Sequence, residues 1–387
     1  MFLFNMEEWK EYKLGELLTI KYGKDHKKLL DGEIPVYGSG GIMRYVERSI
    51  YDGPSILIPR KGTLNNIMYS DKPFWTVDTM FWTTINTVLV NPLFLYYNIC
   101  KKDFASLNVG SAVPSLTVPV IEDIRVFIPS LPTQQKIANI LSSLDDKIEV
   151  NRRINEQLEE LAGALFKSWF VDFEPFKDGE FVDSELGMIP KGWKVGKLEE
   201  LSSYISRGLT PKYDDNSDEI ILGQTCVRNN IVTLNNGRKH KPKKKNEKWI
   251  QQWDVLINST GVGSLGRVGV VYFDKNNVAI DSHITVVRPI SSLYRHYIGR
   301  TLLSKQAEIE NMAIGSTGQT ELPKESVKSM SVLLPNDEVL ELFNKLIEPT
   351  CIIMYNNLEE ITQLTTLRDT LLPKLMSGEI DVNEVEI

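Results

Sequence analysis

The chain has 387 residues, of which 42% are hydrophobic, so it is long enough to bury two or more hydrophobic cores. No stretch approaches the roughly 18 consecutive apolar residues of a membrane span, the first residues do not form a signal peptide, and Cys100, Cys226 and Cys351 lie too far apart for a disulfide framework or a zinc motif. We therefore expect a cytoplasmic protein, and the net charge of −7 argues at first against a nucleic-acid partner.

The distribution of charge along the chain changes that first conclusion. The net charge is 0 over residues 1–129, −4 over 130–180, +5 over 181–335 and −8 over 336–387. The acidic excess is confined to two segments with helical patterns, whereas the other two segments are neutral or basic. This asymmetry is a better guide to partners than the total charge, and it leaves a nucleic-acid partner open.

Stretches of the first half of the chain recur in the second half, which indicates one plan used twice. The matched pairs, in chain order, are Trp9–Lys24 with Trp193–Gly208, Ser55–Ile67 with Asp254–Val268, Thr76–Trp82 with Ala279–Thr285, and Gly110–Pro129 with Gly315–Pro335. The first pair predicts a strand followed by a basic turn. The second predicts a β-branched strand that runs into a polar, glycine-rich loop. Each copy ends at a proline and is followed by a long helical pattern.

The first helical pattern covers Thr133–Phe173, which contains no proline and has apolar residues at alternating steps of three and four. One face carries Ile137, Leu141, Leu144, Ile148, Leu158, Leu165 and Trp169. This predicts a long amphipathic helix with a coiled-coil-like seam. Asn151 and Asn155 occupy two positions of the stripe, either at its exposed edge or as polar contacts that fix the register of a partner helix.

The second helical pattern covers Asp337–Gly378 and has apolar residues at similar spacing. Pro349 interrupts it, so we expect a kink or a fresh start there, because proline in a helix interior costs ~3 kcal/mol. Gly378 follows the last periodic residues, as is common at helix C-termini. The simplest arrangement packs the two helices antiparallel on each other, and the connector Asp172–Trp193 looks irregular.

Two short motifs suggest chemistry that their surroundings do not support. Gly261–Gly266 fits the dinucleotide pattern G-x-G-x-x-G, but the β-branched run that follows predicts a strand and not the helix that receives a pyrophosphate. Asn91–Phe94 resembles part of the Asn-Pro-Pro-Tyr/Phe motif of amino-methyltransferases, yet a helix start with Asn91 as N-cap explains it. The four histidines have no ligand spacing, and no catalytic constellation is visible.

A dense basic run, Arg238–Lys248, lies beside Trp249 and Trp253, and Lys21–Lys28 is its counterpart in the first copy. Such a run is either a solvated loop or a set of phosphate contacts, and its presence in both copies favours contact with nucleic acid. The tryptophans either pack on sugar or support the loop. Arg, Lys, Asn and Gln near the glycine-rich loops are candidates for reading bases. The candidate DNA-binding residues are Lys21, Lys24, Lys27, Lys28, Arg60, Lys61, Asn65, Asn66, Arg207, Gln224, Arg228, Arg238, Lys239, Lys241, Lys243, Lys244, Lys245 and Arg267.

The whole chain resembles the specificity subunit of type I DNA restriction–modification systems. The resemblance rests on LPTQQKIANILSSLDDKIEVNRRINEQLEEL with LFKSWFVDFEPF, on SELGMIPKGWKVGKLEEL, and on LRDTLLPKLMSGEI. It implies a non-catalytic subunit whose two target-recognition domains each read one half of a bipartite double-stranded DNA site. Two modification subunits with AdoMet and the adenine methyltransferase site would dock on it, and two restriction subunits with ATP and Mg²⁺ would join. No cofactor or metal is expected in this chain.

The resemblance implies an α+β fold of two α/β target-recognition domains with β-rich cores, in pseudo-two-fold repeat, separated by two long antiparallel helices. The expected divisions are domain 1 at 1–131, the first conserved helix at 132–173, a connector at 174–190, domain 2 at 191–335, and the second helix with the tail at 336–387. The alternatives are a self-contained DNA adenine methyltransferase, which would need an AdoMet site of its own, and a helical scaffold that does not bind DNA.

Overall fold

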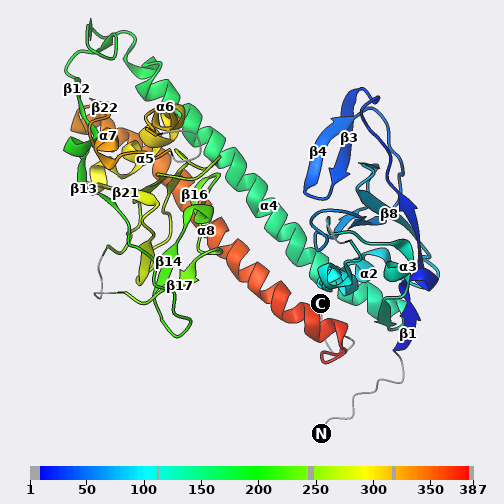
Figure 1. Cartoon of the computed structure of the whole chain (residues 1–387). Coiled ribbons are helices and arrows are strands. Elements are labelled where there is room, and N and C mark those ends of the chain that lie inside the picture. The colour runs from blue at the N-terminus through cyan, green and yellow to red at the C-terminus, as the bar shows by residue number, and fades with distance from the viewer. Residues whose placement is uncertain (1–8, 111–112, 243–247, 316–319, 383–387) are drawn as a thin grey trace. The chain divides into compact units, whose positions relative to one another are not determined.

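The computed structural model describes residues 9–110, 113–242, 248–315 and 320–382 (Figure 1). The chain divides into two compact units, one made of Met1–Glu149 with Ile361–Ile387 and the other of Val150–Glu360. Two long helices, α4 (Leu131–Phe170) and α8 (Asp337–Met376), each contribute to both units. None of the described helices is both long enough and apolar enough to cross a membrane.

The first unit contains small sheets and short helices in its described part. Its strands are β1 (Lys10–Lys13), β2 (Leu18–Tyr22), β3 (Asp31–Gly38), β4 (Gly41–Val46), β5 (Ser55–Pro59), β6 (Met68–Ser70), β7 (Trp75–Thr76), β8 (Met80–Ile85) and β9 (Arg125–Ile128). Its short helices are α1 (Leu14–Leu17), α2 (Pro92–Ile99), the 3₁₀ turn η2 (Phe104–Leu107) and α3 (Val118–Glu122). The sheet orders are β1-β9, β2-β8-β5-β6 and β4-β3-β7.

The second unit repeats this plan with additions. Its strands are β10 (Phe181–Val182), β11 (Ile189–Pro190), β12 (Lys194–Lys197), β13 (Ser202–Arg207), β14 (Ile220–Leu222), β15 (Val227–Arg228), β16 (Asn230–Val232), β17 (Arg238–Lys239), β18 (Val255–Asn258), β19 (Val268–Val270), β20 (Val278–Ile280), β21 (Ile284–Pro289) and β22 (Ser331–Leu334). Its short helices are η3 (Glu174–Phe176), η4 (Leu198–Leu201), η5 (Gln224–Cys226), η6 (Ser292–Tyr294), α5 (Arg295–Ser304), α6 (Gln306–Asn311) and α7 (Lys324–Lys328).

The strand pairing confirms the internal repeat. The orders β12-β22, β13-β21-β18-β19 and β17-β14-β20 of the second unit reproduce β1-β9, β2-β8-β5-β6 and β4-β3-β7 of the first. Even the parallel pair β3–β7 has its counterpart in the parallel pair β14–β20. The strands β15 and β16 extend the larger sheet of the second unit only.

One of the matches made from the sequence is displaced by one residue. The backbone N–H of Gly23 donates to the carbonyl of Met80 at 3.0 Å, and that of Gly208 donates to Ile284 at 3.1 Å. Met80 therefore corresponds to Ile284 and Thr79 to His283, whereas the sequence match pairs Met80 with His283. Backbone hydrogen bonds decide this correspondence because the side chains of the two copies differ.

In each unit a central strand separates two hydrophobic cores. Ile56 and Ile58 of β5 belong to one cluster and Leu57 to another, while in β18 Val255 and Ile257 face one cluster and Leu256 the other. Alternate residues of a strand point to opposite faces, so a strand between two cores must be apolar throughout. This explains why these two stretches read as continuous apolar runs.

The long helices close one core of each unit. In the first unit, Ile137, Ala138 and Leu141 of α4 share a cluster with Leu372 and Leu375 of α8. In the second unit, Phe166 and Phe170 of α4 pack on Phe343 of α8 with ring centroids 6.3 and 4.9 Å apart. Residues late in α4 pair with residues early in α8, so the two helices run in opposite directions, as the antiparallel prediction requires.

The ends of α4 differ by a few residues from the predicted Thr133–Phe173. The helix begins at Leu131 because Pro132 is tolerated in a first turn and Ser130 caps it, with the N–H of Thr133 donating to its hydroxyl at 3.4 Å. It ends at Phe170, since Phe173 adopts a left-handed conformation with φ of 55°.

The expected fresh start of the helix at Pro349 was wrong. The helix α8 runs without interruption from Asp337 to Met376 and does not restart at this residue. Pro349 and Lys345 are both exposed, so water can satisfy the Lys345 carbonyl that lacks its usual N–H donor. Gly378 follows the helix with φ of 73°, as predicted for a C-terminal stop.

The two stripe asparagines contact the partner helix within the second unit. Asn151 is 1% exposed and its amide donates to Glu360 at 2.7 Å, so the exposed-edge explanation was wrong for this residue. The Asn155 amide donates to the carbonyl of Met354 at 3.1 Å and accepts from Asn357 at 2.9 Å. Buried amide contacts of this kind fix the register of paired helices.

The connector is more regular than expected. Residues 172–193 contain η3 and an antiparallel pair, β10 with β11. The turn between them is closed by hydrogen bonds in both directions between the backbones of Ser184 and Gly187 at 3.0 Å, and Gly187 has φ of 89°. Glycine adopts this conformation without strain, which is why it punctuates the turn.

Candidate nucleic-acid interface

The glycine-rich loop of the second unit joins β18 to β19, as its sequence predicted. Gly261, Gly263 and Gly266 have φ of 100°, 71° and 81°. A Cβ at Gly261 would also lie 2.4 Å from the Ser264 hydroxyl oxygen and 2.9 Å from the Gln224 amide oxygen. The loop runs into β19 and not into a helix, which confirms the predicted strand and does not fit the context that a dinucleotide site requires.

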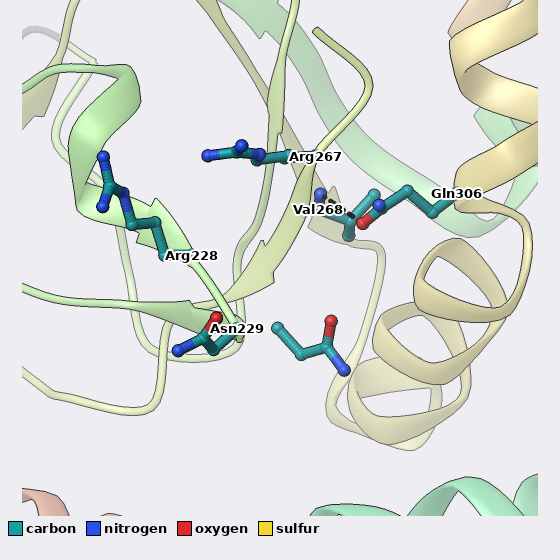
Figure 2. A pocket seen from close by; sticks show the side chains of 6 residues that line it. Arg228, Asn229, Arg267, Val268 and Gln306 are labelled. Atoms are coloured by element: carbon teal, nitrogen blue, oxygen red, sulfur yellow. Dashed lines mark hydrogen bonds between the residues drawn. The ribbon is translucent and has the colours of Figure 1, made fainter. Parts of the chain in front are cut away.

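A polar pocket lies beside this loop. Its volume is about 420 Å³, and it is lined by Arg228, Asn229, Asn230, Arg267, Val268 and Gln306. In Figure 2 the Arg267 side chain extends toward the side on which Arg228 lies and away from Gln306. An Nη of Arg267 donates to the carbonyl of Gly263 at 2.6 Å, so this arginine also braces the glycine-rich loop. Two guanidinium groups here favour an anionic ligand such as a phosphate.

The position of Arg228 follows from a tight turn. Val227 and Arg228 pair with Val232 and Ile231, and the two residues between, Asn229 and Asn230, have φ of 51° and 66°. Positive φ at both central residues is typical of a type I′ hairpin, which asparagine tolerates. The Asn230 amide donates to Glu159 of α4 at 2.9 Å, so the turn is tied to the long helix and presents Arg228 at the surface.

Three polar residues form a cluster at the same end of β18. The Gln224 amide nitrogen donates to the carbonyl and to the hydroxyl of Thr260, the latter at 2.9 Å. That hydroxyl lies 2.9 Å from Nδ1 of His283, which is exposed. Gln224 was a candidate from the sequence, whereas Thr260 and His283 were missed because no ligand spacing marks them.

Arg207 supports the turn that precedes His283. Its guanidinium donates to the carbonyls of Ser282 at 3.1 Å and Leu322 at 2.6 Å, and it forms an ion pair with Glu321 at 2.8 Å. Burial raises the pKa of the Asp281 carboxyl in this turn, partly offset by the backbone N–H of His283. The structure therefore gives Arg207 internal partners, and its contact with DNA stays a prediction.

The basic run is held to the second unit through its first two residues. Arg238 lies over the Tyr213 ring at 3.4 Å, and the Lys239 ammonium donates to the carbonyl of Asp215 at 2.9 Å. Lys241 is exposed. Lys243, Lys244 and Lys245 lie outside the described residues.

Both tryptophans beside the basic run support the fold. The Trp249 indole N–H donates to the buried Glu219 carboxylate at 2.7 Å. Trp253 packs edge-on against Tyr272 and His296, with ring centroids 5.6 and 4.7 Å apart. These contacts favour the loop-supporting explanation over packing on sugar.

The first unit has an exposed basic set, but its expected match with the basic run was wrong, because the set follows β2, the counterpart of β13, whereas the basic run begins on β17, the counterpart of β4. Lys21 lies on β2, while Lys24, Lys27 and Lys28 follow it, and all four are exposed. Lys61 is also exposed, and the Arg60 guanidinium lies 5.7 Å from the Tyr22 ring centroid. Arg60 corresponds to Ser259 of the second unit, because the backbone N–H groups of these residues donate to Thr79 and His283, each at 2.8 Å.

Asn65 and Asn66 have partners within the fold. The Asn65 amide donates to Asp103 at 3.2 Å and accepts from the N–H of Ala105 at 2.8 Å, which caps η2. The Asn66 amide donates to the carbonyl of Ser39 at 2.8 Å. A role for these two residues in reading bases stays a prediction, and their present hydrogen bonds assign them to holding the loop.

The described part of the chain offers little for covalent or metal chemistry. Burial raises the pKa of the Cys100 and Cys351 thiols to about 11, so both are protonated and poor nucleophiles at neutral pH. No group of three or more His, Cys, Asp or Glu residues suited to a metal occurs among the described residues. Asn91 caps α2, with the N–H of Phe94 donating to its side chain at 2.9 Å, which confirms the structural explanation of that motif.

A family model, the type I restriction modification DNA specificity domain, matches residues 6–160 and 190–363. The chain is 29% identical over 353 residues to the type I restriction enzyme MjaIX specificity subunit of Methanocaldococcus jannaschii, across 87% of this chain and 80% of that protein. It is 25% identical over 376 residues to the HindI specificity subunit of Haemophilus influenzae, across 76% and 79% of the two chains.

A solved structure has the same overall fold. The crystal structure of a type I restriction–modification S subunit from M. genitalium has a TM-score of 0.64 against this chain, at 17% sequence identity. The likeness covers 97% of this chain and 98% of the other. The family match therefore spans both copies of the repeat, and the fold match spans nearly the entire chain.

Proposed function

Because the chain belongs to the type I restriction modification DNA specificity family, we propose that it reads a bipartite double-stranded DNA site and positions the modification and restriction subunits on it. The observation that carries this proposal is the family match to both copies of one strand arrangement. The chain is a specificity subunit and not an enzyme in its own right. The alternatives of a self-contained methyltransferase and a scaffold that does not bind DNA receive no support.

We assign one half-site to each copy. Residues 1–131 and 191–335 are the target-recognition domains, 132–173 and 336–387 hold the two conserved helices, and 174–190 connect them. The exposed cations near the glycine-rich loops support this assignment, since phosphate contacts supply most of the affinity for DNA. Lys21, Lys24, Lys61, Arg228 and Arg267 are the described residues best placed to make such contacts.

The long helices offer a surface for other subunits. In the second unit, Leu342, Leu346 and Ile353 of α8 are 54%, 53% and 47% exposed, and with Pro349 they follow the spacing of one helical face. Val150, Ile154 and Leu161 of α4 are also exposed, at 49%, 37% and 57%. Apolar stripes on helices that carry most of the chain's acidic excess fit a protein partner better than DNA.

We infer that these stripes receive the modification subunits, two per complex, and that two restriction subunits complete the assembly in the cytoplasm. AdoMet, ATP and Mg²⁺ then belong to the partner subunits, and this chain supplies recognition and placement. The position at which the chain holds each methyltransferase site determines which adenine of the half-site is methylated.

The DNA-contact assignment is tested by the salt dependence of binding. The complex of this chain with its modification subunits is titrated with DNA containing its site, using Arg228→Ala, Arg267→Ala and the distant control Lys177→Ala. Each lost phosphate contact should reduce the slope of log affinity against log salt by roughly 0.9. Slopes identical to the wild-type value in both arginine variants would count against this interface.

The docking assignment is tested by assembly. Leu346→Glu places a carboxylate on the exposed stripe of α8, and Lys345→Glu, which makes the larger change in net charge, places a carboxylate on the adjacent residue outside it. We expect Leu346→Glu to weaken association with the modification subunits at least tenfold, and the control to have little effect. Equal association of both variants, measured by analytical ultracentrifugation, would contradict a docking role for the stripe.

A further inference from the structure

The atoms of Gln224 and Thr260 determine part of the hydrogen-bond directions in the cluster that they form with His283. The Thr260 carbonyl can only accept, so the part of the Gln224 amide that contacts it must be the NH₂ group. The same NH₂ group lies 2.9 Å from the Thr260 hydroxyl, which therefore also accepts. That hydroxyl keeps its proton and a second lone pair, so it can either donate to Nδ1 of His283, 2.9 Å away, or accept from it.

The tautomer of the imidazole depends on which of these two atoms donates. When the Thr260 hydroxyl donates to Nδ1, the neutral ring carries its proton on Nε2. His283 is exposed, and within the described residues its Nε2 has no hydrogen-bond partner. In that tautomer the ring presents one N–H donor to the surrounding solvent.

The backbone around His283 is fixed on both sides. Its N–H donates to the Asp281 carboxylate at 2.8 Å, and its carbonyl accepts from the N–H of Ser259 at 2.8 Å. The preceding residue, Ser282, accepts from the Arg207 guanidinium at 3.1 Å. Since backbone and ring are both held, the direction in which Nε2 points is set before any ligand arrives, as selective recognition requires.

The equivalent place in the first unit has different chemistry. Backbone hydrogen bonds match Thr79 to His283 and Arg60 to Ser259, so Lys61 corresponds to Thr260. The first unit therefore presents a flexible ammonium and a threonine where the second presents a threonine and an oriented imidazole. Two copies that carry different donors at one place are suited to different bases.

We propose that the Thr260 hydroxyl donates to Nδ1 of His283, and that His283 is a specificity-determining residue of the second half-site whose Nε2–H donates to a base with a hydrogen-bond acceptor in the major groove. This inference rests on the proposed function. Guanine, adenine and thymine each present an acceptor there, whereas cytosine presents only its amino donor. His283 accordingly rejects cytosine at one position. Thr260 and Gln224 are positioning residues that act through the ring.

The test uses the complex of this chain with its modification subunits and a DNA library randomised over both half-sites. Bound sequences are recovered and counted for the wild type, His283→Phe, His283→Asp and Thr260→Val. Thr79→Val, at the equivalent place in the first unit, is the matched control. His283→Phe retains an aromatic ring without a donor, and His283→Asp replaces the donor by an acceptor.

We expect His283→Phe to relax the discrimination against cytosine at a single position of the second half-site by roughly 10- to 100-fold. His283→Asp should prefer cytosine there, because a carboxylate accepts from its amino group. Thr260→Val should weaken the wild-type preference at that same position. Thr79→Val should leave the preference at the second half-site unchanged, because Thr79 belongs to the first unit.

Two results would overturn the inference while leaving the proposed function intact. One is an unchanged base preference at every position in all His283 variants. The other is a uniform loss of affinity for all sequences, which would assign the residue to a phosphate. A wild-type complex that selects no split sequence would instead overturn the proposed function, and this inference with it.

Discussion

A buried ion pair fastens α4 to the body of the second unit, and its removal should destabilise that unit strongly. Arg300 of α5 is 4% exposed and makes two hydrogen bonds to the Glu159 carboxylate, at 2.6 and 2.8 Å. It also donates to the Tyr272 hydroxyl at 2.7 Å. Burial opposes the charge on Arg300, but Tyr272 and Glu159 outweigh it and hold the pKa of the guanidinium above its ordinary value.

The substitution Glu159→Gln tests this contact, because glutamine retains an acceptor for Asn230 while it removes the counter-charge. Breaking a buried pair from one side costs about 3–5 kcal/mol. Because Glu159 is 19% exposed and can be reached by water, we expect the lower value, about 3 kcal/mol. For a unit of about 210 residues each kcal/mol lowers Tm by roughly 2–4 °C, which gives a loss of about 6–12 °C.

Differential scanning calorimetry of the whole chain measures the transition of the second unit. The double variant Glu159→Gln with Arg300→Met removes both charges and should recover part of the loss, since no unpaired buried charge remains. The reasoning would be refuted by a shift below 2 °C in Glu159→Gln. It would also be refuted by a double variant as unstable as the sum of the two single ones.

Three further changes follow from individual residues. Burial beside Arg295 lowers the pKa of His296 to about 3, so acid favours the unfolded state from about pH 6.5 downward. At pH 5 this lowers the free energy of unfolding by roughly 2 kcal/mol. The variant His296→Gln should lose that part of the pH dependence of Tm. Pro349→Ala should stabilise α8 by up to ~3 kcal/mol in urea unfolding, because it restores an N–H donor to the Lys345 carbonyl. Gly261→Ala should weaken DNA binding severalfold without a large change in Tm, since φ of 100° and the 2.4 Å approach to Ser264 forbid a Cβ in this loop. If any of these variants behaves like the wild type in its assay, the structural explanation given for that residue is wrong.

Much of the fold could be predicted from local patterns. The β-branched runs, the glycine-rich loops and the 3.6-residue periodicity are properties of neighbouring residues, so they can be recognised without knowledge of distant contacts. The central strands β5 and β18 are the clearest cases, because continuous apolar sequence reports burial on both faces. The predicted fresh start at Pro349 was wrong because the helix is held by packing at Phe343 and Ile347, which outweighs the local propensity.

The site was harder to predict because its geometry depends on pairs far apart in the chain. Glu159 and Arg300 are 141 residues apart, and Gln224 and Thr260 are 36 apart. Neither pair has a local signature. Asn65 is of a residue type that reads bases but accepts from the N–H of Ala105 in η2, while His283 has no motif and yet presents an oriented imidazole. The sequence could locate these loops, whereas the contacts that their side chains make required the hydrogen-bond network.

The central claim, that this chain selects one split DNA sequence for methylation, is tested most directly by methylome sequencing of cells that carry the modification subunits with and without this chain. The account predicts a methylated adenine motif with two specified halves in the first sample and its complete absence in the second. It also predicts that His283→Phe alters only the second half of the motif. Identical methylation patterns with and without the chain would contradict it.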